Sequence, residues 1–180
     1  MLSTSTSLDR ASRALDYARL FIAGLEYFWV AIGKTSPWQY EESPPRPSPL
    51  LSYIPEIVGF FPVERCELVY PVKDGPIVTT AGQFNAIANW PESSPAELAA
   101  SYATNVYLET TIAADDRNVG TSYRMVGLCR NIVPVNNHLL SKSSLTAGQV
   151  RSYSLDWISS FPPTFLTLSG KSTVQIVRQF

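Results

Sequence analysis

The side chains able to do acid–base or metal chemistry are few in this sequence, and their spacing matches no familiar active site. His138 is the single histidine among the 180 residues, so a paired-histidine metal site cannot be built and little general-base chemistry is available. We expect His138 to lie in a loop or at a strand edge. The sequence holds no Gly-x-Gly-x-x-Gly, Walker or Gly-x-Ser-x-Gly motif. We therefore predict that the chain is not an enzyme.

Two pairs of adjacent carboxylates are the remaining candidates for chemistry. Asp115 and Asp116 have oxygens that suit a divalent cation, but the calcium-loop spacing is missing, and we expect a solvated turn before Gly120. Glu41 and Glu42 fail as a sugar-cleaving pair, because such a site needs two carboxylates facing each other across a gap. Neighbours in an extended segment point to opposite sides. We predict no metal site and no cofactor.

Composition and charge narrow the partners. The formal net charge is −1, which predicts no strong attraction to nucleic acid or to an anionic membrane. No apolar run approaches the roughly 20 residues of a membrane span, and no signal-peptide pattern is visible, so we expect synthesis in a cytoplasm. Charged residues make up 16% of the chain, well below the roughly 25% of average domains, while aromatics reach 12%. Either a surface covered by partners or a Ser/Thr-rich β-sandwich surface explains this composition.

The cysteines, Cys66 and Cys129, have no metal-type spacing. A disulfide between them is one possibility, and two buried thiols are the default expectation in a chain made in a cytoplasm.

An amphipathic helix is predicted near the N-terminus, beginning at Leu8 with Ser7 as its N-cap and Asp9 in its first turn. Its apolar residues follow a heptad spacing. They are Leu8, Ala11, Leu15, Ala18, Ile22 and Leu25. Such a stripe has two explanations: packing on the helix's own domain, or bundling with a neighbouring subunit. We adopt the second and treat residues 1–25 as an assembly element.

A proline-rich segment follows a short apolar strand predicted from Tyr27 to Ile32. We call residues 34–49 the proline arm; it contains Trp38 and Tyr40 and five of the 14 prolines. Proline fixes φ and removes a hydrogen-bond donor, so this segment can be neither a helix nor a central strand. We expect a stiff, extended arm of polyproline type that lies across another surface. The alternative is a surface loop whose Trp38 packs back onto its own domain.

The rest of the chain is predicted to be mainly β. Apolar alternation predicts strands at 63–70, 77–80, 150–155, 165–168 and 173–178, with two more around Val106–Ile112 and Tyr123–Cys129. Residues 50–61 are expected to be irregular and largely buried. Turns are expected at 73–76, closing a hairpin of the strands around it, and at 169–171, closing the last hairpin. A short helix capped by Ser94, with Pro95 first and Glu97 reaching back, interrupts them.

Short strands punctuated by Gly and Pro predict one β-sandwich-like domain over residues 26–180, with an N-terminal α-helix and a long proline-rich extended arm.

Two segments resemble small structural proteins of contractile-tailed bacteriophages. A strand ending in Phe28-Trp-Val-Ala-Ile-Gly-Lys34, then Ser-Pro-Trp38, then Pro44-Pro-Arg-Pro47, is similar to the start of their baseplate wedge proteins. The segment Tyr123-Arg-Met-Val-Gly-Leu128 resembles a strand further along those proteins. The resemblance implies a non-enzymatic virion component, most simply a baseplate wedge or tail protein.

The expected partners are other phage tail or baseplate proteins, or copies of the chain itself, and neither nucleic acid nor membrane. A carbohydrate-binding host-recognition module, using exposed Trp38, Tyr40, Trp90 and Trp157 to stack on sugars, is one alternative, and a neck or tail adaptor is another. Between Arg117 and Arg178 seven basic residues stand against Asp156 alone, which favours an acidic protein neighbour over DNA. The residues expected to bind partners are Leu8, Leu15, Ile22, Leu25, Trp38, Tyr40, Pro44, Pro45 and Pro47.

Overall fold

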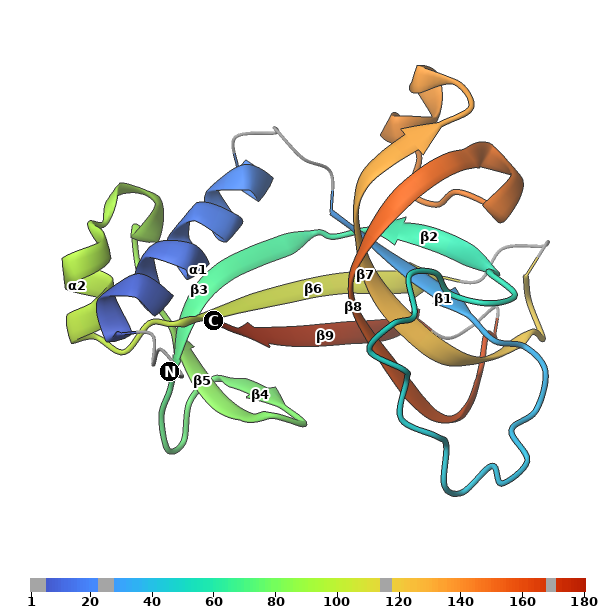
Figure 1. The fold of residues 1–180 in the computed structure, drawn as a ribbon, viewed down its shortest axis with the longest axis horizontal. Coiled ribbons are helices and arrows are strands. Elements are labelled where there is room, and N and C mark those ends of the chain that lie inside the picture. Colours follow the sequence, from blue (N-terminus) through green and yellow to red (C-terminus); the bar gives the residue numbers. More distant parts are fainter. Residues whose placement is uncertain (1–5, 23–27, 114–117, 168–170) are drawn as a thin grey trace. The chain divides into compact units, whose positions relative to one another are not determined.

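The computed structural model describes residues 6–22, 28–113, 118–167 and 171–180. It is a mainly β protein with an N-terminal helix and two antiparallel sheets, which confirms the predicted class (Figure 1). In chain order the elements are α1 (Ser7–Ile22), β1 (Trp29–Gly33), β2 (Gly59–Pro62), β3 (Arg65–Pro71), β4 (Ile77–Thr79), β5 (Gly82–Ala86), 3-10 helix η1 (Trp90–Glu92), α2 (Pro95–Ala100), β6 (Asn105–Ala113), β7 (Ser122–Pro134), 3-10 helices η2 (Asn137–Ser141) and η3 (Ala147–Gln149), β8 (Val150–Phe165) and β9 (Lys171–Gln179).

The chain divides into two compact units. The first comprises Met1–Leu25, Glu64–Glu109 and Gln175–Phe180, and the second comprises Glu26–Val63 and Thr110–Val174. The boundary after Glu109 falls inside β6, and the boundary after Val174 falls inside β9. The predicted division into an assembly element at residues 1–25 and one β-sandwich-like domain over residues 26–180 stays a prediction, and α1 lies in the first of the two compact units.

The first unit is built on the sheet β4-β5-β3-β6-β9. Strand β3 is central, with Val69 opposite Ala86 of β5 on one side and Asn105 of β6 on the other. Apolar residues from β3, β4, β5 and β6 form a buried cluster on this sheet. They are Val69, Ile77, Phe84 and Tyr107.

Helix α1 packs on β3 and α2 within the first unit (Figure 1). Its N-cap is Thr6 rather than the predicted Ser7, because Thr6 Oγ1 accepts from the Asp9 N–H at 3.2 Å. The buried face is made of Ala11, Ala14, Leu15, Tyr17 and Ala18. Three alanines in that face let the helix approach its neighbours closely. The first explanation of the heptad stripe, packing on the helix's own domain, therefore holds over its middle.

Side-chain contacts of Tyr17 and Arg19 fix the C-terminal half of α1. The Arg19 guanidinium donates from Nη2 to the Pro91 carbonyl at 2.9 Å. The Tyr17 ring lies 5.2 Å from the Phe180 ring, and the Arg178 guanidinium lies 4.5 Å from the centre of the Tyr17 ring. The helix therefore contacts both the segment before α2 and the C-terminal strand.

The second unit is built on the sheet β2-β1-β7-β8. Strand β1 is buried along its whole length, since it pairs antiparallel with β2 on one side and β7 on the other. Trp29 and Ala31 of β1 share a core with Phe60, Met125 and residues further along the chain. These further residues are Ile54, Cys129, Ile132 and Leu145. Met125 and Cys129 of the predicted strand around Tyr123–Cys129 therefore both face this core.

Two predicted hairpins are wrong. Strand β4 does not pair with β3 across the turn at 73–76; it pairs with β5, which lies between them in the sheet. The Asp74 N–H donates to the Gln83 side chain at 2.7 Å, which holds this turn against β5 instead. At the other end of the chain, β9 lies beside β6 in the first sheet, whereas β8 belongs to the second. The turn residues 168–170 lie outside the described part of the chain.

Strand β8 extends the strand predicted at 150–155, whereas the strand predicted at 165–168 is wrong at Leu166 and Thr167, which follow the end of β8. Strand β8 runs for 16 residues and passes through Pro162 and Pro163. Both prolines are tolerated because β8 is an edge strand and because they lie within the register shift between the Tyr123–Thr164 and Met125–Ser160 pairs, where the regular ladder is interrupted. Its pairing with β7 shifts register at four places, which explains why apolar alternation is interrupted along it.

Candidate functional site

The proline arm and the residues after it form a long irregular excursion between β1 and β2 (Figure 1). We call residues 34–41 the arm root and residues 42–49 the arm tip. The tip lies between turns at residues 41–42 and 49–50, and it contains no helix or strand. The prediction that residues 34–49 are neither helix nor strand is confirmed. The expectation that residues 50–61 are irregular is wrong at residues 59–61, which belong to β2. The expectation that they are largely buried is wrong as well, since Leu50 is 90% exposed and Tyr53 is exposed.

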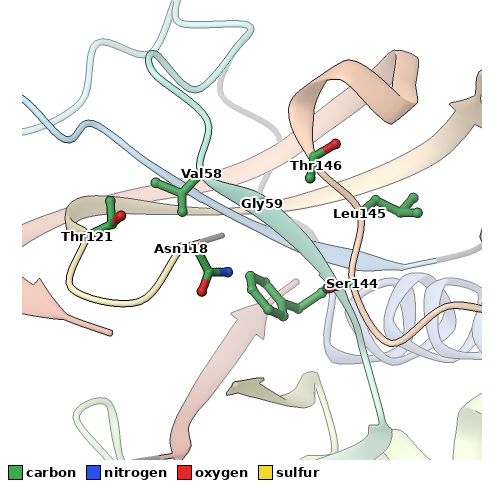
Figure 2. A pocket seen from close by; sticks show the side chains of 8 residues that line it. Val58, Gly59, Asn118, Thr121, Ser144, Leu145 and Thr146 are labelled. Atoms are coloured by element: carbon green, nitrogen blue, oxygen red, sulfur yellow. The ribbon is translucent and has the colours of Figure 1, made fainter. Parts of the chain in front are cut away.

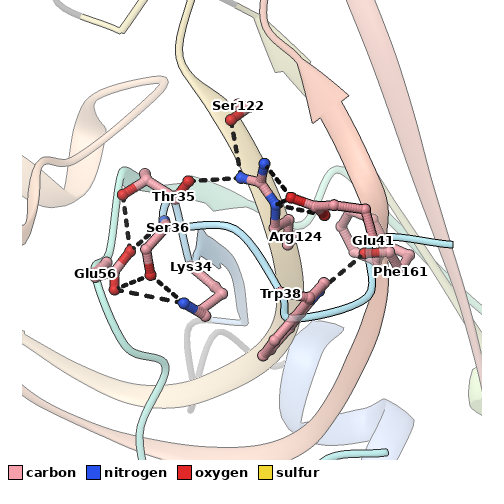
Figure 3. Close-up of polar contacts among 9 residues, drawn as sticks. All are labelled: Lys34, Thr35, Ser36, Trp38, Glu41, Glu56, Ser122, Arg124 and Phe161. Carbon is pink, nitrogen blue, oxygen red and sulfur yellow. Dashed lines mark hydrogen bonds and ion pairs between the residues drawn. The ribbon is translucent and has the colours of Figure 1, made fainter. Parts of the chain in front are cut away.

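A carboxylate organises the beginning of the arm root. Glu56 accepts from the Ser36 N–H and hydroxyl, both at 2.6 Å, and from the Thr35 hydroxyl at 2.8 Å (Figure 3). The Lys34 ammonium lies 3.7 Å from the same carboxylate. The hydrogen bonds from Ser36 lower the pKa of Glu56 to about 2, with smaller contributions from Thr35 and from the Lys34 charge. Segments before and after the tip are thereby joined.

The backbone supports this junction. Lys34 and Glu56 both adopt left-handed conformations, with φ of 59° and 51°. The Lys34 N–H donates to the Pro55 carbonyl at 2.7 Å. At Gly33 a Cβ atom would come within 2.6 Å of Ile54 Cγ2 and the Pro55 oxygen, so only glycine permits this close approach.

A buried arginine anchors the end of the arm root. Arg124 of β7 is buried, and its Nε lies 2.9 Å from both carboxylate oxygens of Glu41 while its Nη2 lies 2.8 Å from one of them (Figure 3). Its Nη1 donates to the Thr35 carbonyl at 2.6 Å and to the Ser122 hydroxyl at 3.0 Å. The hydrogen bond from Arg124 holds the pKa of Glu41 below its usual value. Such charge-assisted, forked contacts fix orientation as well as distance.

Trp38 packs back onto the second unit. It is half-buried against the core of that unit, and its Nε1 donates to the Phe161 carbonyl at 3.4 Å (Figure 3). The Lys34 ammonium lies 5.1 Å from the centre of its ring. The alternative expected from the sequence therefore describes Trp38, whereas Tyr40, two residues later, is 69% exposed.

The arm tip is mostly exposed. Among the described residues its hydrogen bonds stay local: the Ser43 N–H donates to the Tyr40 carbonyl and the Leu51 N–H to the Ser48 carbonyl. Pro44 and Pro47 are half-buried, and Pro45 is exposed. The structure thus describes an arm that is fixed at its root and open along its tip.

The predicted helix positions separate into two groups. Leu15 is fully buried in the first unit, so its assignment to a partner surface is wrong: it belongs to the unit's own core. Leu8 and Ile22 are 50% and 54% exposed, at the two ends of α1. Leu25 lies outside the described residues. Helix and arm residues are in different units, and each set is considered by itself.

Three residues that matter here were not predicted. Arg124 and Glu56 anchor the arm root, and Leu50 is the most exposed large apolar side chain among the described residues. A signal for Arg124 was present in the sequence, since a charged residue inside an apolar strand pattern needs a partner when the strand is buried. Nothing local indicated that this partner is Glu41, 83 positions away.

The residues considered for chemistry form no catalytic cluster within the described part of the chain. His138 is exposed on η2, and Asp115 and Asp116 lie outside the described residues. No group of three or more potential metal ligands is found among residues 6–22, 28–113, 118–167 and 171–180. Cys66 and Cys129 are buried free thiols, each with its pKa raised to about 12 by burial. No helix in these same ranges is long and apolar enough to cross a membrane.

The second unit also contains a pocket of about 250 Å³ beside β2 (Figure 2). The Gly59–Pro62 strand and the segment before η3 meet here through paired hydrogen bonds between Phe60 and Leu145, at 2.8 and 2.9 Å. The lining residues are Val58, Gly59, Phe61, Asn118, Thr121, Ser144, Leu145 and Thr146. None of these eight carries a group that titrates near neutral pH, so the pocket offers neutral hydrogen-bonding groups and no acid or base.

Of the aromatic residues considered for sugar stacking, Trp90 is buried in the first unit, which removes it from that set. Trp38 and Trp157 are half-buried, and Tyr40 remains exposed.

Comparison with known proteins agrees with the resemblance noted in the sequence. The family model described as "Baseplate wedge 3 tail fiber network component" matches residues 7–180. The chain is also 33% identical over 111 residues to "Virion protein 3" of Enterococcus phage phiEF24C, a match that spans 58% of each protein. The family match covers nearly the whole chain, both units included. This chain therefore belongs to the baseplate wedge 3 tail fiber network component family, and it is a structural protein of a phage virion.

Proposed function

We propose that the chain joins neighbouring subunits of the baseplate and its tail fibre network, and that the arm tip with its flanking residues Tyr40 and Leu50 is the main contact. The observation that carries the proposal is the contrast between root and tip. Arg124 and Glu56 hold the root in charge-assisted hydrogen bonds, while Tyr40 and Leu50 expose large apolar surfaces at either end of the tip. Exposed aromatic and apolar side chains on a pre-ordered segment are typical of interface anchors.

The exposed ends of α1 are a second contact in this proposal. The side chains of Leu8 and Ile22 are about half exposed, although one face of the helix between them is buried on its own unit. We retain residues 1–25 as an assembly element in this narrower sense: the middle of α1 completes the first unit, and its ends meet a neighbour. The neighbours are other baseplate or tail proteins, or second copies of the chain.

The experiment is incorporation of variants into particles. A phage lacking its own copy is grown with the protein supplied from a plasmid, and copies per purified particle are counted by quantitative mass spectrometry. The double variant Tyr40→Ala/Leu50→Ala should lose binding free energy of hot-spot size, about 2–4 kcal/mol, while the purified protein unfolds at an unchanged temperature.

The matched control is Val78→Ala/Val133→Ala, which truncates two other exposed apolar side chains, one in each unit. It should be incorporated like the unmodified chain. Normal incorporation of a well-folded Tyr40→Ala/Leu50→Ala protein would show that the arm does not join subunits.

A further inference from the structure

The exposure of the arm tip repeats every three residues. Pro44 and Pro47 are half-buried, whereas the two residues after each of them are exposed: Pro45 and Arg46, then Ser48 and Pro49. A polyproline II helix has three residues per turn and no internal hydrogen bonds. One edge of the tip, formed by Pro44 and Pro47, therefore faces its own unit, and the other two edges face outward.

The backbone of the tip is unsuited to strand pairing. Four of the six residues from Pro44 to Pro49 are prolines and have no N–H to donate. A neighbour cannot build a regular β ladder on such a segment. Recognition must use its carbonyl oxygens and side chains, which is how grooves that bind polyproline helices work.

Both ends of the tip are held in place. Arg124 fixes Glu41 at one end. Beyond the other end Ile54 is buried in the core of the second unit, and its N–H donates to the Tyr153 hydroxyl at 3.1 Å. A segment held at both ends loses less conformational entropy when it binds than a free loop does.

Arg46 is the single cation of the tip, and it is exposed. Within the described part of the chain no ion pair or side-chain hydrogen bond of Arg46 is found, in contrast to Arg124, which is fully engaged. A planar guanidinium beside prolines fits a carboxylate bidentately. A single cation is too little for binding to nucleic acid, which depends on many phosphate contacts.

We infer that the arm tip is a ligand for an aromatic-lined groove on a neighbouring virion protein, and that this groove carries a carboxylate opposite Arg46. The inference rests on the proposed role of the arm in joining subunits and adds the chemistry of the partner's surface. Aromatic rings pack against proline rings without needing donors from the tip, and the carboxylate sets the direction in which the tip lies.

Cross-linking in assembled particles tests the groove directly. The photoreactive amino acid p-benzoylphenylalanine replaces Ser48, an exposed position of the tip, and in a control protein it replaces exposed His138. After irradiation of purified particles the cross-linked peptides are identified by mass spectrometry. We expect the Ser48 position to capture a peptide of another virion protein that contains both aromatic and acidic residues.

Capture of a segment without aromatic or acidic residues would overturn the groove while leaving the joining role of the arm intact. No capture at Ser48 in particles that contain the protein would overturn both proposals.

Charge reversal gives a second, independent measurement. Arg46→Glu should reduce incorporation about tenfold or more, since a charge-assisted hydrogen bond is lost and a repulsion is added. Arg46→Lys should retain part of the incorporation. The matched control Lys142→Glu makes the same charge change at another exposed position and should have no effect. Changing the captured carboxylate to lysine should restore incorporation of Arg46→Glu, and failure of this rescue would contradict the pairing.

Discussion

Leu15→Ala decides whether α1 belongs to the first unit or serves only assembly. Leu15 is fully buried, on a helix face that packs against β3 and α2. Truncating a buried leucine removes its transfer free energy and leaves a cavity, which together reduce the free energy of unfolding by 2–5 kcal/mol, or about 3 kcal/mol for a typical site. In a chain of this size each kcal/mol lowers the unfolding temperature by about 2–4 °C, so we expect a decrease of about 6–12 °C.

The matched control is Leu8→Ala, the same substitution on the same helix at a position that is 50% exposed. It should change the free energy of unfolding by less than about 1 kcal/mol, because half of the side chain already faces solvent. Thermal unfolding followed by circular dichroism measures both variants. Hydrogen exchange of the amides in residues 7–22 adds a local reading, since loss of packing should lower protection there first.

The opposite pattern would refute this reasoning. If Leu15→Ala unfolded at the same temperature as the unmodified chain but failed to enter particles, α1 would be an assembly helix without a role in its own unit. If Leu8→Ala destabilised the chain as strongly as Leu15→Ala, the exposed end of α1 would not be a free contact surface.

Three further predictions follow from the second unit and from the thiols. The folded-state pKa of Glu56 is lowered to about 2, so its contribution to stability is complete above about pH 4.5 and is lost as the pH falls toward 2. Glu56→Gln should therefore flatten this part of a plot of unfolding temperature against pH. An unchanged slope would contradict the role of Glu56 in holding the arm root. Trp38→Ala should lower the unfolding temperature whereas Tyr40→Ala should not, as measured by thermal unfolding, and equal effects would contradict their different burial. Cys66 and Cys129 should resist alkylation at pH 8 and react only after denaturant is added, since burial raises the pKa of both thiols to about 12; rapid labelling of the folded chain would show that they are accessible.

Features set by neighbouring residues could be predicted from the sequence. The helix α2 is the clearest case: Ser94 accepts from the Glu97 N–H at 3.3 Å, and the Glu97 carboxylate accepts from the Ser94 N–H at 2.8 Å. Every group in this capping box lies within four residues, so its geometry follows from local backbone chemistry. The buried residues Val106, Leu108 and Ile112 of β6 and the apolar strand β1 were predictable for the same reason.

Features set by distant residues could not be predicted. The short strand β5 carries polar Gln83 and Asn85, so its sequence has no apolar run, yet it separates β3 from β4 in the sheet. The order of strands in a sheet depends on pairing between segments that are far apart in the sequence, and local patterns do not encode it. The placement of Trp38 likewise depends on the Phe161 carbonyl, 123 positions away.

The arm root and the arm tip differ in how many substitutions the fold tolerates. Arg124 is buried, and removing its partners would leave a charge without compensation in the second unit, so the arm root is constrained by stability. Substitutions at Arg46 or Pro45 meet no such constraint, because these side chains are exposed and surface substitutions away from special features change stability little. Stability and assembly should therefore divide by burial along the arm: variants of the buried contacts of Arg124 and of Trp38 should lose stability, whereas variants of exposed residues such as Arg46 should fold normally but fail to join their neighbour.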